Sequence, residues 1–234
     1  MDRRSAALFM IAACFAVPAA AQETKMPRTI SLTGHGETRV VPDMALVTIG
    51  VMSQAETARE ALTANTAAME HIFATLKAAG IAEKDVQTSN FSVQPRYDYS
   101  NNTQPPRLAG YDVSNTVSVT VRALAGLGPL LDQVVSAGSN QVNGILFQVS
   151  KPEAALDGAR KLAAADATRK AKVYATAMSL TLGDVLALTE GGGYRPPPPI
   201  YAQAMRAEGG AADVPVAPGE QELSVDVNIT WEIK

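Results

Sequence analysis

Apolar residues recur along this chain with two different periods, and the order in which these periods follow one another constrains the fold most. Alternation at every second residue is typical of a β-strand with one buried face, and spacings of three and four are typical of an amphipathic helix. The closing segment 222–233 has apolar residues at each odd position, whereas segment 56–79 follows the helical spacing and is followed by Gly80. The sequence therefore predicts a chain that mixes strands with helices.

The two periods predict elements in the order strand, strand, helix, strand, strand, helix, strand, helix, strand, strand. The strands are expected at 29–37, 44–53, 86–96, 111–122, 142–150, 184–189 and 222–233, and the helices at 56–79, 129–137 and 153–182. The turn-rich stretch 97–110 should join its neighbours as a long antiparallel hairpin.

Helix-plus-hairpin units recur in this order, which indicates an α+β fold rather than a doubly wound parallel sheet. We expect two similar layers of mainly antiparallel strands packed against amphipathic helices. The first unit should span residues 22–123, and the second should span residues 124–234.

Two of the predicted helices carry features that affect packing. Asn65 lies in the middle of the apolar stripe of the 56–79 helix, where a buried amide without partners would cost roughly 1–3 kcal/mol. We interpret it as a structural residue that ties the helix to a strand backbone, in preference to a ligand role. The inward seam of the 153–182 helix is expected at Leu156, Ala159, Ala163, Ala167, Ala171, Tyr174 and Met178, and its alanines would allow a close approach to a sheet.

Residues 1–21 have the features of a secretory signal peptide. A basic start is followed by the apolar run 6–17 and by Ala19-Ala20-Ala21, so we expect cleavage after Ala21 and a periplasmic mature protein. The apolar run is shorter than the roughly 20 residues that span a bilayer. Ile11-Ala12-Ala13-Cys14 is also similar to a lipobox, which leaves a lipoprotein anchored through Cys14 as the alternative.

Composition removes several classes of function. Cys14 is the only cysteine, so the expected mature chain has no disulfide, thiol nucleophile or thiolate metal site. The formal net charge is −3 and no basic cluster interrupts it, which disfavours nucleic-acid binding. His35 and His71 occur without a pattern such as H-E-x-x-H, so no metal site is predicted.

Local motifs for catalysis are missing as well. Gly34-His35-Gly36 begins like a dinucleotide fingerprint, but Arg39 stands where the third glycine is needed. Asp43, Asp85 and Asp112 lie near predicted strand starts, where aspartate is usually a turn former. We therefore predict no catalytic and no cofactor-binding residue, and hence a protein that is not an enzyme.

A Gly- and Pro-rich loop is expected over residues 191–219. Four consecutive prolines favour a stiff polyproline II segment, and loops of this length are usually functional or disordered. Tyrosines flank the prolines, so this stretch is our candidate interface loop, with plain surface disorder as the alternative. Its candidate residues are Tyr194, Pro196, Pro197, Pro198, Pro199 and Tyr201.

Several short motifs, taken in their order along the chain, resemble the SIMPL-domain family. The resemblance spans nearly the whole expected mature chain, although each fragment alone is unspecific. The fragments are Gly34-x-Gly36 before Pro42-Asp43, Ala58-x-x-Ala61-x-x-x-Asn65, Gly80-Ile81 before Asp85-x-Gln87-Thr88, Gly110-Tyr111 before Asn115, Asn143 and Phe147 before Ala159-Arg160, Tyr174-Ala175, Leu182-Gly183 and Pro218-Gly219-Glu220.

The resemblance implies an α+β protein of the bacterial envelope without catalytic residues or cofactors. It further implies a ring-like or channel-like homo-oligomer, associated in bacterial members with oxidative-stress defence. The expected partner is therefore a second copy of the chain, no other envelope partner is identified, and membrane contact would come only through the oligomer or a lipidated Cys14. Alternatives are a periplasmic carrier or scavenger with a groove for a small ligand, and a hydrolase that uses Asp43 or His35.

Overall fold

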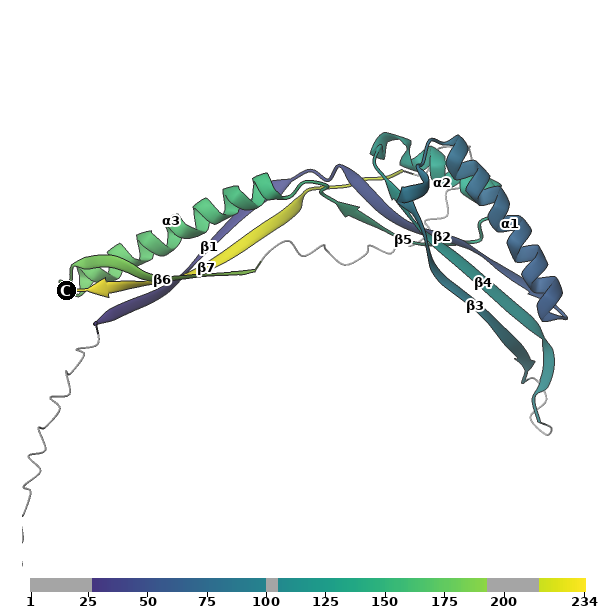
Figure 1. Cartoon of the computed structure of the whole chain (residues 1–234), viewed down its shortest axis with the longest axis horizontal. Helices are drawn as coiled ribbons and strands as arrows, with labels where there is room; N and C mark the ends of the chain where they lie inside the picture. Colours follow the sequence, from purple (N-terminus) through teal and green to yellow (C-terminus); the bar gives the residue numbers. More distant parts are fainter. Residues whose placement is uncertain (1–26, 100–104, 193–214) are drawn as a thin grey trace, which may run out of the picture.

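The computed structural model describes residues 27–99, 105–192 and 215–234, and these residues form an α+β fold with two antiparallel sheets (Figure 1). All ten elements expected from the periodicity are present. In chain order they are β1 (Thr29–Val40), β2 (Met44–Ala55), α1 (Ala58–Ala78), β3 (Val86–Asp98), β4 (Arg107–Val121), α2 (Leu127–Ser136), β5 (Gln141–Gln148), α3 (Glu153–Ala177), β6 (Leu182–Gly192) and β7 (Gln221–Ile233), with short 3-10 turns at Glu83–Asp85 and Leu124–Gly126.

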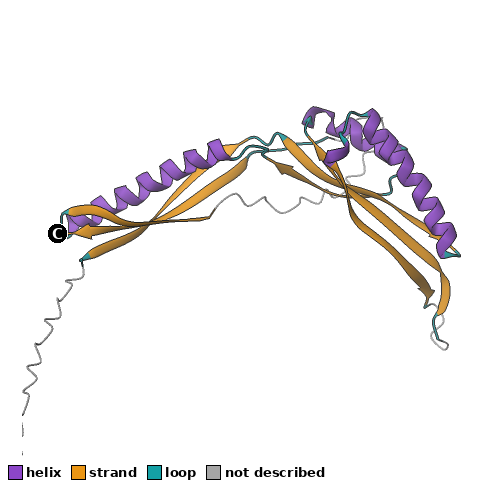
Figure 2. Cartoon of the chain, viewed as in Figure 1, coloured by secondary structure: helices purple, strands orange, loops and turns teal. Residues whose placement is uncertain are grey.

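One sheet has four strands in the order β3-β4-β2-β5, and α1 and α2 cover one of its faces (Figure 2). β3 and β4 pair antiparallel from Val86 opposite Val119 to Asp98 opposite Arg107, which confirms the predicted hairpin. Apolar residues of β2 and β4 alternate toward the helices and are almost completely buried. The core of this unit includes Val47, Ile49, Val117, Val119, Ile72, Leu76 and Val134.

The other sheet has three strands in the order β1-β7-β6, and α3 lies along one face of it (Figure 2). The alternating apolar residues of β7 face the alanine seam of α3. The core of this unit consists of Leu156, Ala159, Ala163, Ala167, Ala171, Leu223, Val225, Val227, Ile229 and Trp231.

Backbone contact between α3 and β1 explains the Gly34-x-Gly36 motif. A Cβ atom on Gly34 would lie 2.0 Å from the carbonyl oxygen of Ala163, and one on Gly36 would lie 2.1 Å from that of Ala159. No side chain fits at these distances, so the two glycines and the alanines together bring helix and strand into direct contact. The motif is therefore a packing device.

The last part of the predicted α3 seam is wrong. Tyr174 and Met178 are 47% and 62% exposed, whereas Ala175 is buried at 5%. The buried positions continue in steps of four from Ala159 to Ala175, because the helix lies on the sheet along its i, i+4 ridge. The helix also ends at Ala177, five residues before the predicted end.

Both sheets combine strands from either side of the expected boundary between residues 123 and 124. β1 pairs with β7, from Thr29 opposite Glu232 to Val40 opposite Gln221, while β5 and α2 belong to the four-stranded unit. The chain passes between the units at 41–43, at 149–152 and again at 215–220, where Val216 packs against the four-stranded unit before β7 begins. The four-stranded unit is therefore continuous in sequence, and the three-stranded unit is assembled from both ends of the described chain (Figure 1).

Candidate functional site

Asn65 lies at the contact between α1 and the four-stranded sheet and is 1% exposed. Its Nδ2 donates to the carbonyl oxygens of Val51 at 2.9 Å and Val113 at 3.2 Å, so one amide group connects α1 to both β2 and β4. Its Oδ1 has no hydrogen-bond partner among the described residues. Thr57 and Glu60 form a capping box that fixes the start of the same helix. This geometry suits a structural tie.

Asp43 lies at the junction between the two units, directly before β2. Its carboxylate accepts hydrogen bonds from the backbone N–H of Ser150 at 2.7 Å and from the Ser150 hydroxyl. These bonds, the hydroxyl first, lower the pKa of Asp43. Because Ser150 belongs to the connection between β5 and α3, the pair joins the two places where the chain passes from one unit to the other.

Asp85 and Arg122 form a two-pronged ion pair at the same end of the four-stranded sheet as Asp43, since Ala45 lies opposite Val121. The Arg122 guanidinium donates to both Asp85 oxygens, at 2.7 and 3.2 Å, and lowers the pKa of the Asp85 carboxyl. The pair lines an open hollow of about 620 Å³ near the ends of α1 and α2. Because the two charges neutralise each other, this pair leaves no charge in the hollow that could bind a ligand.

Asp112, the third predicted turn former, lies inside β4 instead of at a strand start. Its Oδ1 lies 3.6 Å from Nε of Arg96 across the β3–β4 hairpin. Asp112 is therefore a polar residue within the sheet that faces Arg96. It does not lie near Asp43, either along the chain or in the fold.

His35 lies on the exposed face of the three-stranded sheet. Its Nδ1 is 2.8 Å from Oδ1 of Asp226 on β7, and this hydrogen bond raises the pKa of the imidazole. The backbone N–H of His35 donates to Asp166 of α3 at 3.1 Å. His71 is exposed on α1, in the other unit.

The two histidines therefore do not share a site. Within residues 27–99, 105–192 and 215–234, no three His, Cys, Asp or Glu side chains gather as a cation site would require. Among the helices described here, none combines the length and the apolar character needed to cross a bilayer.

Several predicted features lie outside the described residues. These are the leader 1–21 with Cys14, and the candidate interface loop with Tyr194, Pro196, Pro197, Pro198, Pro199 and Tyr201. They stay predictions from the sequence.

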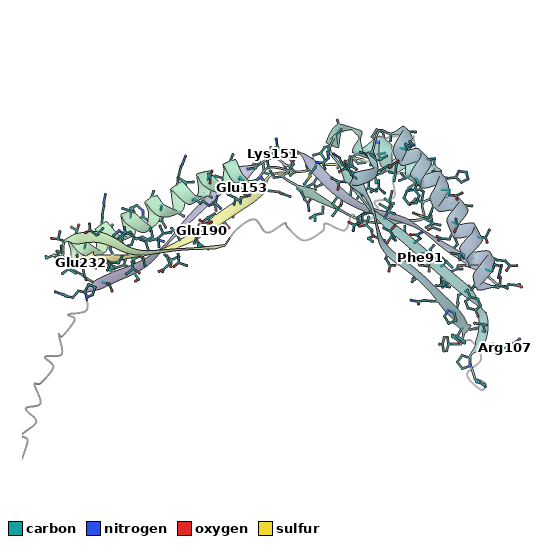
Figure 3. The ribbon with its side chains drawn as sticks, in the orientation of Figure 1. Phe91, Arg107, Lys151, Glu153, Glu190 and Glu232 are labelled. Carbon is teal, nitrogen blue, oxygen red and sulfur yellow. The ribbon has the colours of Figure 1, made fainter. Side chains whose placement is uncertain are left out.

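Exposed apolar side chains gather along one edge strand of each sheet. On β3, Phe91 and Val93 are 54% and 42% exposed; on β6, Val185 and Leu188 are 55% and 59% exposed. Figure 3 shows Phe91 and Glu190, which label β3 and β6, on separate units. The sequence alternation identified both strands, but it could not show that their helix-side faces are left uncovered.

A shallow groove of about 360 Å³ runs between α1 and the start of β3. It is lined mainly by apolar side chains, with Phe73, Leu76, Ile81 and Val86 among them. This volume lies at the low end of the range for small-molecule sites, roughly 300–1,000 Å³. From β3, the groove includes Val86 and Thr88, whereas the exposed Phe91 and Val93 lie farther along the same strand.

Comparison with known proteins gives one consistent result. The sequence model of the SIMPL family, described as a protein of unknown function (DUF541), matches residues 30–231. The chain is 40% identical over 236 residues to the 26 kDa periplasmic immunogenic protein of Brucella melitensis, covering 96% of this chain and 94% of that protein. It is 34% identical over 171 residues to the uncharacterized protein YggE of Escherichia coli K12, covering 71% and 68%. The chain therefore belongs to the SIMPL family.

Proposed function

We propose that this chain is a non-catalytic protein of the bacterial periplasm that works as a homo-oligomer with a ring-like or channel-like form. One observation carries the proposal: each sheet has an edge strand with exposed apolar side chains, β3 in one unit and β6 in the other. Edges that lack a second strand neighbour among the described residues favour pairing with another chain. The periplasmic location is supported by the printed name of the Brucella melitensis relative and by the signal-like leader.

The native mass of the mature chain, residues 22–234, tests assembly. Light scattering coupled to gel filtration over a dilution series should give a mass of several subunits that persists at low concentration. A mass equal to one chain at every concentration would overturn the proposal. The charge-neutral character of β3 makes high salt a poor dissociating agent, so the oligomer should survive it.

Within this proposal, the assembly belongs to oxidative-stress defence, an assignment that rests on the family resemblance alone. Deleting the gene should lower survival under peroxide or superoxide, and the wild-type gene should restore it. Equal survival of the deletion strain and its parent would remove this part of the proposal while leaving the assembly untouched.

A second candidate function is a carrier or scavenger of a small apolar ligand. The groove between α1 and β3 favours it, because Phe73 is 42% exposed there and would be covered by an occupant. Native mass spectrometry of gently purified protein should then show added mass that a Phe73→Ser variant loses. A protein that is empty and fails a screen of apolar ligands would rule this function out.

A further inference from the structure

The two sheets of the described chain end in four edge strands, and two of these edges are covered by the chain itself. At β1, the Asp166 carboxylate accepts from the backbone N–H of His35 at 3.1 Å, and Lys170 Nζ donates to the carbonyl oxygen of Thr33 at 2.9 Å. Both groups of α3 thus occupy backbone positions that another strand would need.

The edge of β5 is covered in a different way. The side-chain amide of Gln221, at the start of β7, donates to the carbonyl oxygen of Phe147, and Val216 packs against the core of the four-stranded unit. Side chains and loops that fill an edge are a common protection against strand addition. β1 and β5 are therefore poor candidates for contact with another chain.

β3 and β6 lack such cover in the described structure, where each has a strand neighbour on one side only. Phe91 and Val93 lie opposite Asn115 and Val113, on the face that carries α1. Directly opposed residues in an antiparallel pair share a face. The exposed side chains of β3 therefore point to the helix side of the sheet, beyond the area that α1 covers.

β6 repeats this arrangement in the other unit. Val185 and Leu188 lie opposite Trp231 and Ile229, which are buried against α3. They too point to the helix side of their sheet, and no other part of the described chain covers them. Neither strand contains lysine, a residue that often protects an exposed edge, although Pro95 and the register shifts of both strands interrupt parts of the two edges. The edges lie on different units, so they do not meet within one chain (Figure 3).

We propose that β3 of one copy pairs edge to edge with β6 of the next copy, an inference that rests on the assembly proposed above. The joined sheet would have the order β5-β2-β4-β3-β6-β7-β1 across the two copies, with the two covered edges at its ends. Each copy would use β3 toward one neighbour and β6 toward the other. Such a head-to-tail contact repeats, and it closes into a ring when the rotation permits.

Charge favours this pairing over pairing of like strands. If β6 met a second β6 antiparallel and centred on Ala187, Asp184 would lie opposite Glu190 on both sides of the centre. Like charges directly opposite each other destabilise a strand pair. The charged residues of β3 are Arg96 and, at the end of the strand, Asp98, so the acidic strand β6 can pair along Val86–Arg96 without placing acid against acid.

Two edge-blocking variants test the inference. Phe91→Lys with Val93→Lys blocks β3, and Val185→Lys with Leu188→Lys blocks β6. All four residues are exposed in the single chain, so circular dichroism should show both variants folded. Each variant alone should have the mass of one chain. A one-to-one mixture should form a complex of two chains and nothing larger, because only one intact β3 and one intact β6 can meet.

Val41→Lys with Val135→Lys is the matched control, since these valines are 60% and 53% exposed and lie outside β3 and β6. It should assemble as the native chain does. If either blocked variant alone forms dimers, or both assemble normally, the β3–β6 pairing is wrong although assembly stands. If the native chain itself is a single copy, the proposed function fails instead.

Cross-linking gives an answer even if a lysine variant fails to fold. The expected mature chain lacks cysteine, so Asn90→Cys on β3 and Ala187→Cys on β6 can each be the single thiol. A flexible bifunctional thiol reagent should link the two proteins after they are mixed and reassembled, and should link neither protein to itself. Assembled protein that gives no mixed cross-link would contradict the inference.

Discussion

At the scale of single residues, the polar side chains of this protein act mainly as connectors. Asn65 joins α1 to two strands, Asp43 joins two chain crossings, and Asp226 holds His35 across the β1–β7 pair. Each of these groups bonds to the protein itself, which agrees with a proposal based on assembly. Two of them lead to measurable predictions at this scale.

Replacing Asn65 by alanine should lower the free energy of unfolding by about 2 kcal/mol, because the buried carbonyl groups of Val51 and Val113 lose a donor. Urea unfolding followed by circular dichroism would measure the change. Asn143→Ala, at an exposed position of β5, is the control and should stay within about 0.5 kcal/mol of the native value. Equal effects of the two substitutions would contradict the structural role of Asn65.

Replacing Asp226 by asparagine should lower the pKa of His35 toward its ordinary value, since the carboxylate is the main cause of the rise. A raised pKa means that the pair stabilises the fold below about pH 6.5, the unfolded value, and that this contribution is lost as the pH rises through the folded pKa. Proton NMR titration of the native chain and of the variant would show it. An unchanged His35 titration would show that Asp226 is not the cause.

At the scale of elements, β1 and α3 depend on small residues at their contact. The glycine-alanine contact leaves no room for a β-carbon on β1. A strand this close to a helix makes van der Waals contacts along the whole row of alanines. A larger side chain at a single position would separate the two elements and remove these contacts.

Gly36→Ala should therefore destabilise the protein by about 3 kcal/mol, because the new methyl group would meet backbone atoms of Ala159 and Ala163 that cannot turn away. Thermal unfolding would measure it. Gly191→Ala is the matched control in another strand, where nothing lies within 4 Å of the added atom. A tolerated Gly36→Ala with an unchanged melting temperature would show that the contact is looser than described.

Local pattern was sufficient to predict the elements and the β3–β4 hairpin, because periodicity and turn residues act over short stretches of chain. It could not predict that β1 pairs with β7, since no local signal connects residues so far apart. The pattern also wrongly placed Tyr174 and Met178 in the buried seam of α3. A seam with steps of three and four residues and a seam with steps of four only predict nearly the same buried positions until the last turns of the helix. The sequence could not reveal the open edges for a similar reason. Phe91 and Val93 alternate with polar residues, as the buried apolar residues of other strands do.

At the scale of the whole molecule, two units are joined by short crossings at 41–43 and 149–152, and Lys151 and Glu153 mark the second crossing in Figure 3. The bonds between Asp43 and Ser150 hold these crossings together. The relation between the units therefore depends on these polar contacts and on the segment before β7, where Val216 packs against the core of the four-stranded unit.

Asp43→Asn should lower stability by about 1 kcal/mol at pH 7, because the amide accepts less strongly from Ser150. The pKa of Asp43 is lowered in the folded chain, so its contribution is present above the unfolded value of about 3.9 and disappears as the pH falls through the folded value. Denaturation midpoints at pH 7 and at acidic pH would show the difference shrinking. Asp132→Asn, exposed on α2, is the control and should stay within about 0.5 kcal/mol of the native stability at pH 7.

The pairing of the first strand with the last sets the order in which the molecule can be completed. A chain that emerges N-terminus first holds β1 without its neighbour until residues 221–233 follow, whereas residues 44–148 already contain every strand of their own sheet. Distant pairings are also slow to form. Pulse-labelling hydrogen exchange during refolding should show amides of β2 and β4 protected before those of β1 and β7, and the reverse order would exclude this sequence of events. Until residues 221–233 have been made, the growing chain has a complete four-stranded unit and an incomplete three-stranded unit.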